Sequence, residues 1–459
     1  MREVAMPYIP HSDDDIREML DTIGAISADD LFATIPESLR LRHPLELPAP
    51  MPEPELVAHL KALADKNRPG EVSFMGGGIY NHFVPSVVWT LAMRPEFATA
   101  YTPYQAEVAQ GTLQAIYEFQ THVCRLTGMD VANASLYDGA TAVAEAALLA
   151  ANHTGRTRIV VSETVNPLYR EVLAAMVSGR DLEITTLPSE RGVTNSAEYG
   201  RHIDDSAACL ILASPNFFGC LEEMESGEQA IHRAGGLFIT VFDPISLGIL
   251  KAPTEYKADI AVGEGQPLGI PRSFGGPLLG LFAAKKDFVR KIPGRLVGRT
   301  EDAQGRTGFV LTLQTREQHI RRDKATSNIC TSEALCATAA TIYLSLMGKT
   351  GLPQVARLSA ERAHYLAGKI ATTNGYRLWT DQPFFKEFVV ETPVAPAKIL
   401  AEMALVGIAG GIDLGRYFPM LDSHLLIAAT EMVSFADCDR FVSGLERLAA
   451  GKRLVEMQA

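Results

Sequence analysis

The middle of the chain alternates short apolar runs with longer segments of helical period. Residues 105–127 and 138–152 repeat their apolar positions with the period of a helix. The short runs are rich in β-branched and aromatic residues and predict strands at 158–162, 182–186, 208–213, 237–242 and 278–284. Strands that alternate with helices favour a mainly parallel sheet covered on both faces. In such a sheet, catalytic groups are expected at the carboxyl ends of the strands.

The first part of the chain has a different pattern. Ser12 and Ser27 are placed to cap short helices, and closely spaced prolines separate them from a helix expected at residues 55–66. A segment interrupted by so many prolines buries little against itself. We therefore expect residues 1–69 to form an N-terminal arm of helical and extended segments that lies across the body of the protein or a partner chain.

The remaining residues divide into a large and a small domain. Residues 70–345 are expected to form the large α/β domain, and residues 346–459 a small C-terminal α+β domain. The pattern predicts helices over 332–347, 352–372 and 396–406, and a last helix from about residue 434. It predicts strands near 376–379, 387–390 and 425–429.

Composition excludes several classes of protein. The net charge of -12 argues against a nucleic-acid partner, which would require an excess of Lys and Arg. The six cysteines show no spacing typical of a zinc site or a disulfide framework, so no metal is expected. The apolar runs are too short or too interrupted to span a bilayer, and residues 1–10 lack the features of a signal peptide. A soluble cytoplasmic protein is expected.

The first candidate functional residues lie at the ends of two predicted strands. The apolar run 237–242 leads into Asp243, and the next short strand leads into Gln266. This layout resembles pyridoxal-phosphate enzymes of the aspartate-aminotransferase fold (fold type I), in which an Asp binds the pyridine nitrogen and a Lys forms the Schiff base. An amide forms no imine, so the chain is not expected to hold the cofactor covalently. Alternatively, Asp243 is simply a turn former before Pro244.

The helix that begins near Asp138 is where this fold would bind the phosphate of the cofactor, through unpaired N–H groups and the positive end of the helix dipole. Asp138 is itself the expected N-cap. Its carboxylate would occupy the same donors and repel a phosphate. The alternative is that Asp138 is an ordinary N-cap with no bearing on function.

Three other segments contain candidate site residues. Residues 101–111 combine phenols, amides and a carboxylate, the usual lining of a small-molecule pocket, although a helix start alone would explain Thr102 and Pro103. In residues 75–85, three glycines permit close approach of a ligand or another chain, and His82 is either a site residue or a structural histidine. The candidates for the pocket or its rim are His82, Tyr101, Tyr104, Glu107, Gln110, Thr326, Ser327 and Asn328.

A basic run stands out in this acidic chain. Residues 285–299 contain six basic side chains and one acid. Such a run is either a solvated face or a positive rim that receives an acidic protein partner. The candidate rim residues are Lys285, Lys286, Arg290 and Lys291.

Seven segments strongly resemble the glycine cleavage system P-protein, and more narrowly its first subunit (α) in organisms that divide the protein into two chains. They are Met75-Gly-Gly-Gly-Ile-Tyr-Asn-His-Phe-Val-Pro85, Gly263-Glu-Gly-Gln-Pro-Leu-Gly269, Ser273-Phe-Gly-Gly-Pro277 and residues 101–111, 128–135, 214–219 and 324–331. The resemblance covers nearly the whole chain, from Met6-Pro-Tyr-Ile-Pro10 to the terminal domain. No Schiff-base lysine is expected in that subunit, which accounts for Gln266.

The resemblance implies a function in glycine catabolism. The β subunit would supply the lysine and pyridoxal phosphate, and the α subunit would complete the pocket in an α2β2 heterotetramer. This oxidoreductase decarboxylates glycine and passes the aminomethyl group to the lipoyl group of H-protein. The resemblance therefore implies the β subunit, lipoylated H-protein and glycine as partners, and it implies neither a nucleic acid nor a membrane.

Two other functions remain open from the sequence. The first is an independent pyridoxal-phosphate enzyme that uses Lys251 or Lys257, although both precede the second strand, on the side away from the expected site. The second is a non-catalytic scaffold or regulatory protein that kept the fold. A pure scaffold has little use for the polar cluster at residues 101–111.

Overall fold

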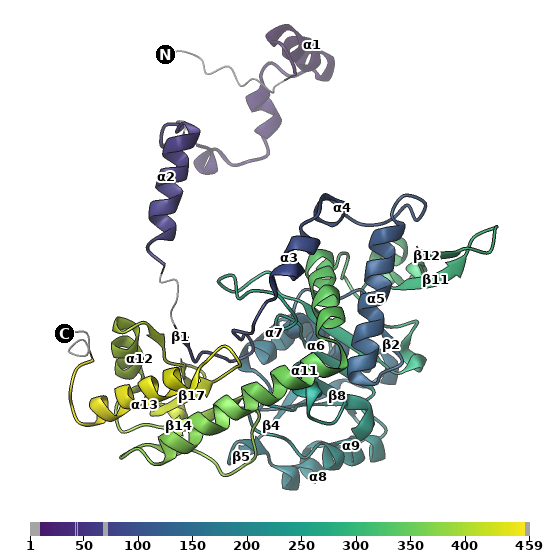
Figure 1. Cartoon of the computed structure of the whole chain (residues 1–459). Coiled ribbons are helices and arrows are strands. Elements are labelled where there is room, and N and C mark those ends of the chain that lie inside the picture. Colours follow the sequence, from purple (N-terminus) through teal and green to yellow (C-terminus); the bar gives the residue numbers. More distant parts are fainter. Residues whose placement is uncertain (1–9, 42, 44, 68–71, 455–459) are drawn as a thin grey trace. The chain divides into compact units, whose positions relative to one another are not determined.

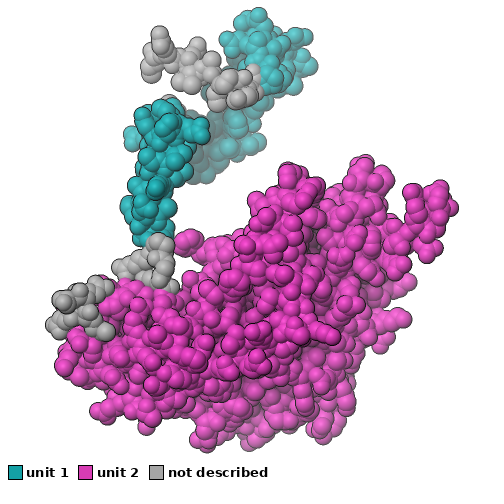
Figure 2. All heavy atoms as spheres, viewed as in Figure 1, with its two compact units in different colours: residues 1–68 teal, residues 69–459 magenta. Residues whose placement is uncertain are grey.

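The computed structural model describes residues 10–41, 43, 45–67 and 72–454. The first nine residues, where a signal peptide was judged absent, and the expected domain boundary at residues 69 and 70 lie outside these ranges. The chain forms two compact units, residues 1–68 and 69–459, which Figure 2 draws in different colours. Each unit is described by itself.

The first unit consists of short helices joined by extended segments. Helix α1 (Asp13–Ile23) begins at Ser12, whose hydroxyl accepts the N–H of Asp15, so the predicted cap is confirmed. A 3-10 helix (Ala28–Phe32) follows Ser27. Helix α2 (Glu53–Ala64) lies within two residues of the helix predicted at residues 55–66. Every described residue of this unit is at least partly exposed, so these helices form no core of their own.

A seven-stranded sheet forms the centre of the second unit, with the order β2-β10-β9-β8-β7-β3-β4. Its strands are β2 (Val131–Ala132), β3 (Arg158–Ser162), β4 (Glu183–Leu187), β7 (Ala207–Ala213), β8 (Leu237–Phe242), β9 (Ile260–Glu264) and β10 (Gly280–Ala284). Five strands are parallel, and β10 runs antiparallel to both of its neighbours. The mainly parallel sheet is confirmed, with strand ends within two residues of those predicted.

Helices cover both faces of this sheet, so its inner strands are buried on both sides. Ile239 and Val241 of β8 join one core with α6 (Gly139–Thr154) and α7 (Pro167–Val177). Phe242 faces a second core, which contains α5 (Gln110–Thr127) and α3 (Ser86–Ala92). Helices α8 (Tyr199–His202) and α9 (Met224–Arg233) pack against Phe238. The alanines of α6 let this helix lie close to the sheet.

Two features of the second unit differ from the sequence predictions. Helix α5 begins at Gln110, five residues later than predicted. At this helix start the Gln110 side chain binds the backbone of Phe309. Phe309 belongs to a hairpin of β11 (Val297–Glu301) and β12 (Thr307–Leu311), which the sequence analysis did not predict.

The long helix α11 (Ala334–Ala371) leads from the central sheet to the C-terminal elements (Figure 1). It contains a break at Gly348, so the two predicted helices are consecutive parts of one element. An antiparallel sheet follows, with the order β13 (Arg377–Leu378), β14 (Glu387–Glu391), β17 (His424–Ala428) and β16 (Ile412–Asp413). Helices α12 (Pro396–Leu405) and α13 (Phe435–Ala449) pack on it.

The glycine-rich segment enters the second unit through this C-terminal part. Strand β1 (Val72–Ser73) pairs with β15 (Ile408–Ala409), and Phe74 is fully buried among the C-terminal helices and strands. Residues 75–85 then pass from the C-terminal sheet to the carboxyl edge of the central sheet. Across the described residues, no helix has the length and apolarity needed to cross a membrane.

Candidate functional site

A small cavity lies at the carboxyl edge of the central sheet, where β8 leads into Asp243 and β9 ends at Glu264. Its volume is about 60 Å³, which is space for a few water molecules. The polar residues that line it are Tyr80, Asn166, Tyr169, Asn216, Asp243 and Glu264. This is the edge at which the sequence analysis expected the chemistry.

Gln266 is buried beside this cavity, with 1% of its surface exposed. Its Oε1 accepts the N–H of Tyr80 at 3.0 Å, and its Nε2 donates to the carbonyl oxygens of Tyr80 at 3.1 Å and of Ile270 at 2.7 Å. An amide offers both a donor and an acceptor, so it can bind the N–H and the carbonyl oxygen of the same residue, whereas an ammonium offers donors only. Gln266 therefore holds the glycine-rich segment against the central sheet.

Two carboxyl groups occupy backbone donors at the start of α6. Asp138 Oδ1 accepts the N–H of Thr141 at 2.6 Å, which confirms the predicted N-cap. Glu264 Oε2 accepts the N–H of Gly139 at 2.9 Å, and its Oε1 accepts two more backbone N–H groups, from Gln266 at 2.8 Å and Leu279 at 2.9 Å. Burial raises the pKa of Glu264 to about 8, against the opposing effect of these donors.

Asp243 has two contacts at the end of β8. Its Oδ1 accepts the N–H of Ile245 at 2.9 Å, which confirms its role as a turn former. Its Oδ2 lies 2.6 Å from Nζ of Lys386, whose side chain is only 2% exposed. Lys386 immediately precedes β14 of the C-terminal sheet. A buried ion pair thus joins the end of the central sheet to the C-terminal sheet.

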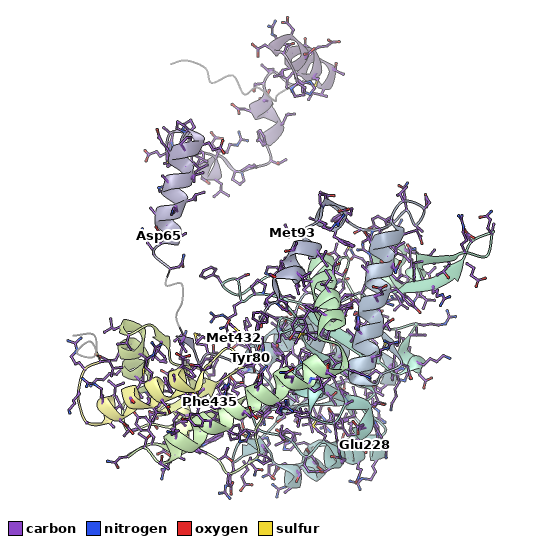
Figure 3. All side chains as sticks on the ribbon, viewed as in Figure 1. Asp65, Tyr80, Met93, Glu228, Met432 and Phe435 are labelled. Carbon is purple, nitrogen blue, oxygen red and sulfur yellow. The ribbon has the colours of Figure 1, made fainter. Side chains whose placement is uncertain are left out.

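Lys386 uses its remaining donors within the same cluster. Its Nζ lies 2.9 Å from Nε2 of His82 and 3.7 Å from the centre of the Tyr80 ring. Tyr80, labelled in Figure 3, lies near Met432 of the C-terminal part in that view, and the carbonyl oxygen of Asn81 accepts a hydrogen bond from Thr430. Asp243, Lys386, His82 and Glu431 are called the ionic cluster below.

His82 is a neutral member of the ionic cluster. Its Nε2 accepts from the Lys386 ammonium, so we assign its proton to Nδ1, which lies 2.8 Å from Glu431 Oε2. Burial and the nearby ammonium lower the pKa of His82. Burial also disfavours the charged form of Glu431, but hydrogen bonds from His82 and the Phe83 N–H hold its pKa at about 2. His82 therefore lies inside the protein as a structural link.

The glycines of residues 75–85 make room for another carboxyl group. Glu387 accepts the Gly77 N–H at 2.7 Å and the Tyr80 hydroxyl at 2.8 Å. A Cβ atom on Gly76 would lie 2.0 Å from Glu387 Oε1. Burial raises the pKa of Glu387 to about 7. The close approach predicted for these glycines is thus made by a side chain of the same chain.

The candidates from residues 101–110 lie elsewhere, against the β11–β12 hairpin. Tyr101 is 79% exposed, and Glu107 is also exposed. The Tyr104 hydroxyl accepts from Nη2 of the buried Arg295 at 3.1 Å, and the guanidinium carbon lies 5.3 Å from the Tyr104 ring centre. Gln110 binds both backbone groups of Phe309. These residues form an exposed polar surface, separate from His82.

The last pocket candidates precede α11. The Ser327 hydroxyl accepts the N–H of Ile329 at 3.1 Å and also contacts the buried carboxyl of Glu145. Thr326 is half-buried, and Asn328 is exposed. The structure therefore places the predicted pocket residues in three groups: His82 inside, residues 101–110 at the hairpin, and residues 326–328 before α11.

The predicted basic rim lies at the opposite edge of the sheet from the cavity. Lys285 follows the end of β10, where Ala284 pairs with Ile260 at the beginning of β9. Lys285 Nζ binds Asp259 Oδ1 at 2.5 Å, and Lys291 contacts His153. Lys286 and Arg290 are exposed. The structure thus separates this rim from Asp243 and Glu264.

Four charged residues of the site were not identified from the sequence: Glu264, Lys386, Glu387 and Glu431. A signal was present for two of them. Lys386 and Glu387 interrupt an otherwise apolar run at residues 384–390, where charged side chains are rare unless they are paired. Glu264 ends β9, and Glu431 lies three residues beyond the end of β17. Neither had a comparable signal, because polar residues are ordinary at strand ends and in the loops that follow them.

This arrangement defines a class of protein. The parallel sheet, the Asp at the end of β8 and the helix that begins at Gly139 form the scaffold of a fold type I pyridoxal-phosphate enzyme. The residues present do not fit the cofactor, because Gln266 forms no imine and carboxyl groups occupy the start of α6. Lys251 is 65% exposed and paired with Glu225, and Lys257 lies in a turn before β9. Neither lysine lines the cavity.

Comparisons with known proteins agree with this fold class and also identify a family within it. A NifS-like protein superposes with a TM-score of 0.61 at 11% identity, over 83% of this chain and 100% of that chain, which supports the fold alone. The family model described as glycine cleavage system P-protein matches residues 6–445. The chain therefore belongs to the glycine cleavage system P-protein family.

Several similar proteins match this chain over nearly its whole length and over their own. The crystal structure of a glycine decarboxylase (P-protein) of the glycine cleavage system, in inhibitor-bound form, has a TM-score of 0.86 at 45% identity over 96% of this chain and 100% of that chain. The probable glycine dehydrogenase (decarboxylating) subunit 1 of Chloroherpeton thalassium is 51% identical, covering 96% and 100% of the two chains. The protein of the same description from Moorella thermoacetica is 50% identical, covering 97% and 100%.

Proposed function

We propose that this chain is the subunit of glycine decarboxylase that carries no cofactor, and that it is active only with a partner subunit. The assembled enzyme decarboxylates glycine and transfers the aminomethyl group to the lipoyl group of H-protein. The observation that supports this most directly is Gln266, an amide fully engaged with backbone groups at the position of the expected Schiff-base lysine. Full-length relatives described as subunit 1 support a second subunit.

In this proposal the β subunit carries pyridoxal phosphate and supplies the chemistry, in an α2β2 heterotetramer that works in the cytoplasm. This chain contributes walls and orientation to the shared pocket. The surface at Tyr101, Tyr104 and Glu107 is the strongest candidate for that role. Its side chains are exposed, yet the buried Arg295 holds Tyr104 through a hydrogen bond and its guanidinium face. Such a fixed polar surface suits contact with a substrate or a partner chain.

The experiment that tests the proposal is reconstitution from separate chains. Each subunit is purified alone, and glycine-dependent exchange of labelled carbon dioxide is measured for each chain and for the mixture, with and without lipoylated H-protein. We expect exchange only when both subunits are present, with stimulation by H-protein. Exchange catalysed by this chain alone would refute the proposal.

The assignment of the polar surface has its own test. Tyr101→Phe and Glu107→Ala should lower the exchange rate of the reconstituted enzyme, because both groups are expected to face the shared pocket. Tyr365→Phe is the matched control, since this tyrosine binds Asp439 on the C-terminal helices. Full turnover in both test variants would remove these residues from the site.

The basic rim is tested by affinity for lipoylated H-protein. Lys286→Ala combined with Arg290→Ala removes two exposed charges without disturbing the pair of Lys285 with Asp259. If the rim receives H-protein, the apparent affinity falls and becomes less sensitive to salt. Lys251→Ala serves as the control. Unchanged affinity would identify the rim as a plain solvated surface.

The alternative of a non-catalytic scaffold or regulator is not favoured. The relatives that match the full length of this chain are described as subunits of the enzyme itself.

A further inference from the structure

Three features of the fold type I scaffold hold pyridoxal phosphate: a lysine, an aspartate for the pyridine nitrogen, and a helix start for the phosphate. We propose that this chain fills all three positions with its own side chains, and that these side chains exclude the cofactor and join the central sheet to the C-terminal sheet. Gln266 replaces the lysine, Lys386 takes the place of the pyridine nitrogen, and Glu264 takes the place of the phosphate.

The start of α6 is the place where the fold would bind the phosphate of the cofactor. A phosphate at a helix start binds backbone N–H groups that have no partner inside the helix. Here Glu264 accepts the Gly139 N–H, and Asp138 accepts the Thr141 N–H. Two further bonds, from the backbone of Gln266 and Leu279, fix the Glu264 carboxyl. An incoming phosphate would have to displace a carboxyl group that is hydrogen-bonded on both oxygens.

Asp243 is the residue that the fold would place beside the pyridine nitrogen. In the parent fold Asp243 would face a protonated ring nitrogen, whereas here Oδ2 faces the Lys386 ammonium at 2.6 Å. One cation replaces another. The ammonium is also bonded to His82 and lies over the Tyr80 ring, so its contacts are complete. Displacing it would leave a buried charge without its partner.

The lysine position and the cavity complete the inference. Gln266 is bound to the peptide groups of Tyr80 and Ile270, and the cavity beside it has a volume of only about 60 Å³. The three side chains come from the residue just before β14 and from the residues at and after the end of β9. Together with residues 75–85 they connect two sheets. Restoring a lysine at position 266 alone should therefore not restore cofactor binding.

The first experiment uses the unmodified chain. Pyridoxamine 5′-phosphate binds without a lysine, so equilibrium dialysis of this ligand against the chain alone tests the phosphate and pyridine positions directly. We expect no saturable binding. Saturable binding that phosphate ions compete away would overturn the inference and leave the proposed function in the assembled enzyme intact.

The second experiment tests the three positions by substitution. Gln266→Lys is incubated with pyridoxal phosphate, reduced with borohydride and analysed for pyridoxyl-lysine, with circular dichroism to confirm folding. We expect no label at residue 266. Label there at one equivalent per chain would overturn the inference. Adding Lys251→Met to the Gln266→Lys background is the control for labelling of surface lysines, since Lys251 is exposed.

The triple variant Gln266→Lys, Glu264→Ala, Lys386→Met frees all three positions. We expect an affinity for pyridoxal phosphate about tenfold or more above that of Gln266→Lys, the change that corresponds to one displaced interaction. A folded triple variant with no such gain would overturn the inference. Should this variant not fold, the dialysis of the unmodified chain and the labelling of Gln266→Lys still decide the question, because neither depends on it.

Discussion

Lys386 Nζ lies 2.6 Å from Asp243 Oδ2, so a single buried ion pair connects the end of a strand in the central sheet with the start of a strand in the C-terminal sheet. Removing one partner of such a pair leaves an uncompensated buried charge. We predict that Lys386→Met lowers the free energy of unfolding by about 3–5 kcal/mol. Equilibrium unfolding in urea measures this change.

A double-mutant cycle separates the ion pair from other effects of the substitution. Lys386→Met combined with Asp243→Asn should be more stable than Lys386→Met alone, because the carboxylate that lost its partner becomes neutral. Lys251→Met is the control: it breaks the exposed pair with Glu225, and it should change stability little. Equal loss from Lys386→Met and Lys251→Met would contradict the burial argument.

The space around Gly76 is too small for a side chain, so we predict that a substitution there destabilises the fold. In Gly76→Ala the new Cβ would meet Glu387 Oε1 at 2.0 Å and Ala428 Cβ at 2.7 Å. Glu387 can move away only by giving up its bonds to Gly77 and Tyr80. We expect a loss of about 1–3 kcal/mol in the free energy of unfolding, measured in urea.

Gly368→Ala provides the matched control for this substitution. Gly368 lies inside α11, and no atom outside its own helix lies within 4 Å of a Cβ placed there. Alanine is the better helix former, so this variant should gain up to about 1 kcal/mol. A stable Gly76→Ala variant would show that Glu387 adopts another position without cost.

The parts of the fold that depend on local pattern were predictable from the sequence. The strands of the central sheet other than the two-residue β2 were predicted from their apolar runs, and Asp138, Asp243 and Gln266 followed from their positions at the ends of predicted elements. Even the alternative roles of Asp243 could be stated in advance. The structure then showed that Asp243 forms the turn and also binds Lys386.

The parts that depend on distant contacts were not predictable. Lys386 and His82 are 304 residues apart in the sequence, and no local pattern indicates that they meet. The start of α5 was predicted five residues too early, and no local pattern indicates the contact of Gln110 with the backbone of Phe309, 199 residues away. The sequence leaves His82 as either a site residue or a structural histidine, because only its neighbours in the fold decide between the two.

The buried carboxyl of Glu264 predicts a loss of stability on the alkaline side. Its pKa rises from 4.5 to about 8 in the folded chain, so the folded state holds this proton more tightly than the unfolded state. The stabilisation is complete below pH 4.5 and is lost as the pH rises through about 8. Glu387, with a pKa of about 7, contributes in the same direction.

The unfolding free energy measured in urea across this pH range checks the prediction. Glu264→Gln should reduce the fall between pH 4.5 and about 8, because the amide does not titrate. The exposed Glu118→Gln serves as the control and should keep the slope of the unmodified chain. An unchanged slope in Glu264→Gln would mean that this carboxyl is ionised in the folded chain at neutral pH.

The lowered pKa of His82 predicts a loss of stability as the pH falls, opposite in direction to the effect of Glu264. Burial and Lys386 lower its pKa below the ordinary 6.5, so the folded state holds fewer protons there than the unfolded state. The stabilisation is present above pH 6.5 and is lost as the pH falls below it. His82→Asn should therefore show a shallower loss of unfolding free energy as the pH falls below 6.5, measured in urea. His202→Asn, at a partly exposed histidine beside Glu198, should keep the original slope. Identical slopes in both variants would show that His82 is charged in the folded chain and that its assigned proton position is wrong.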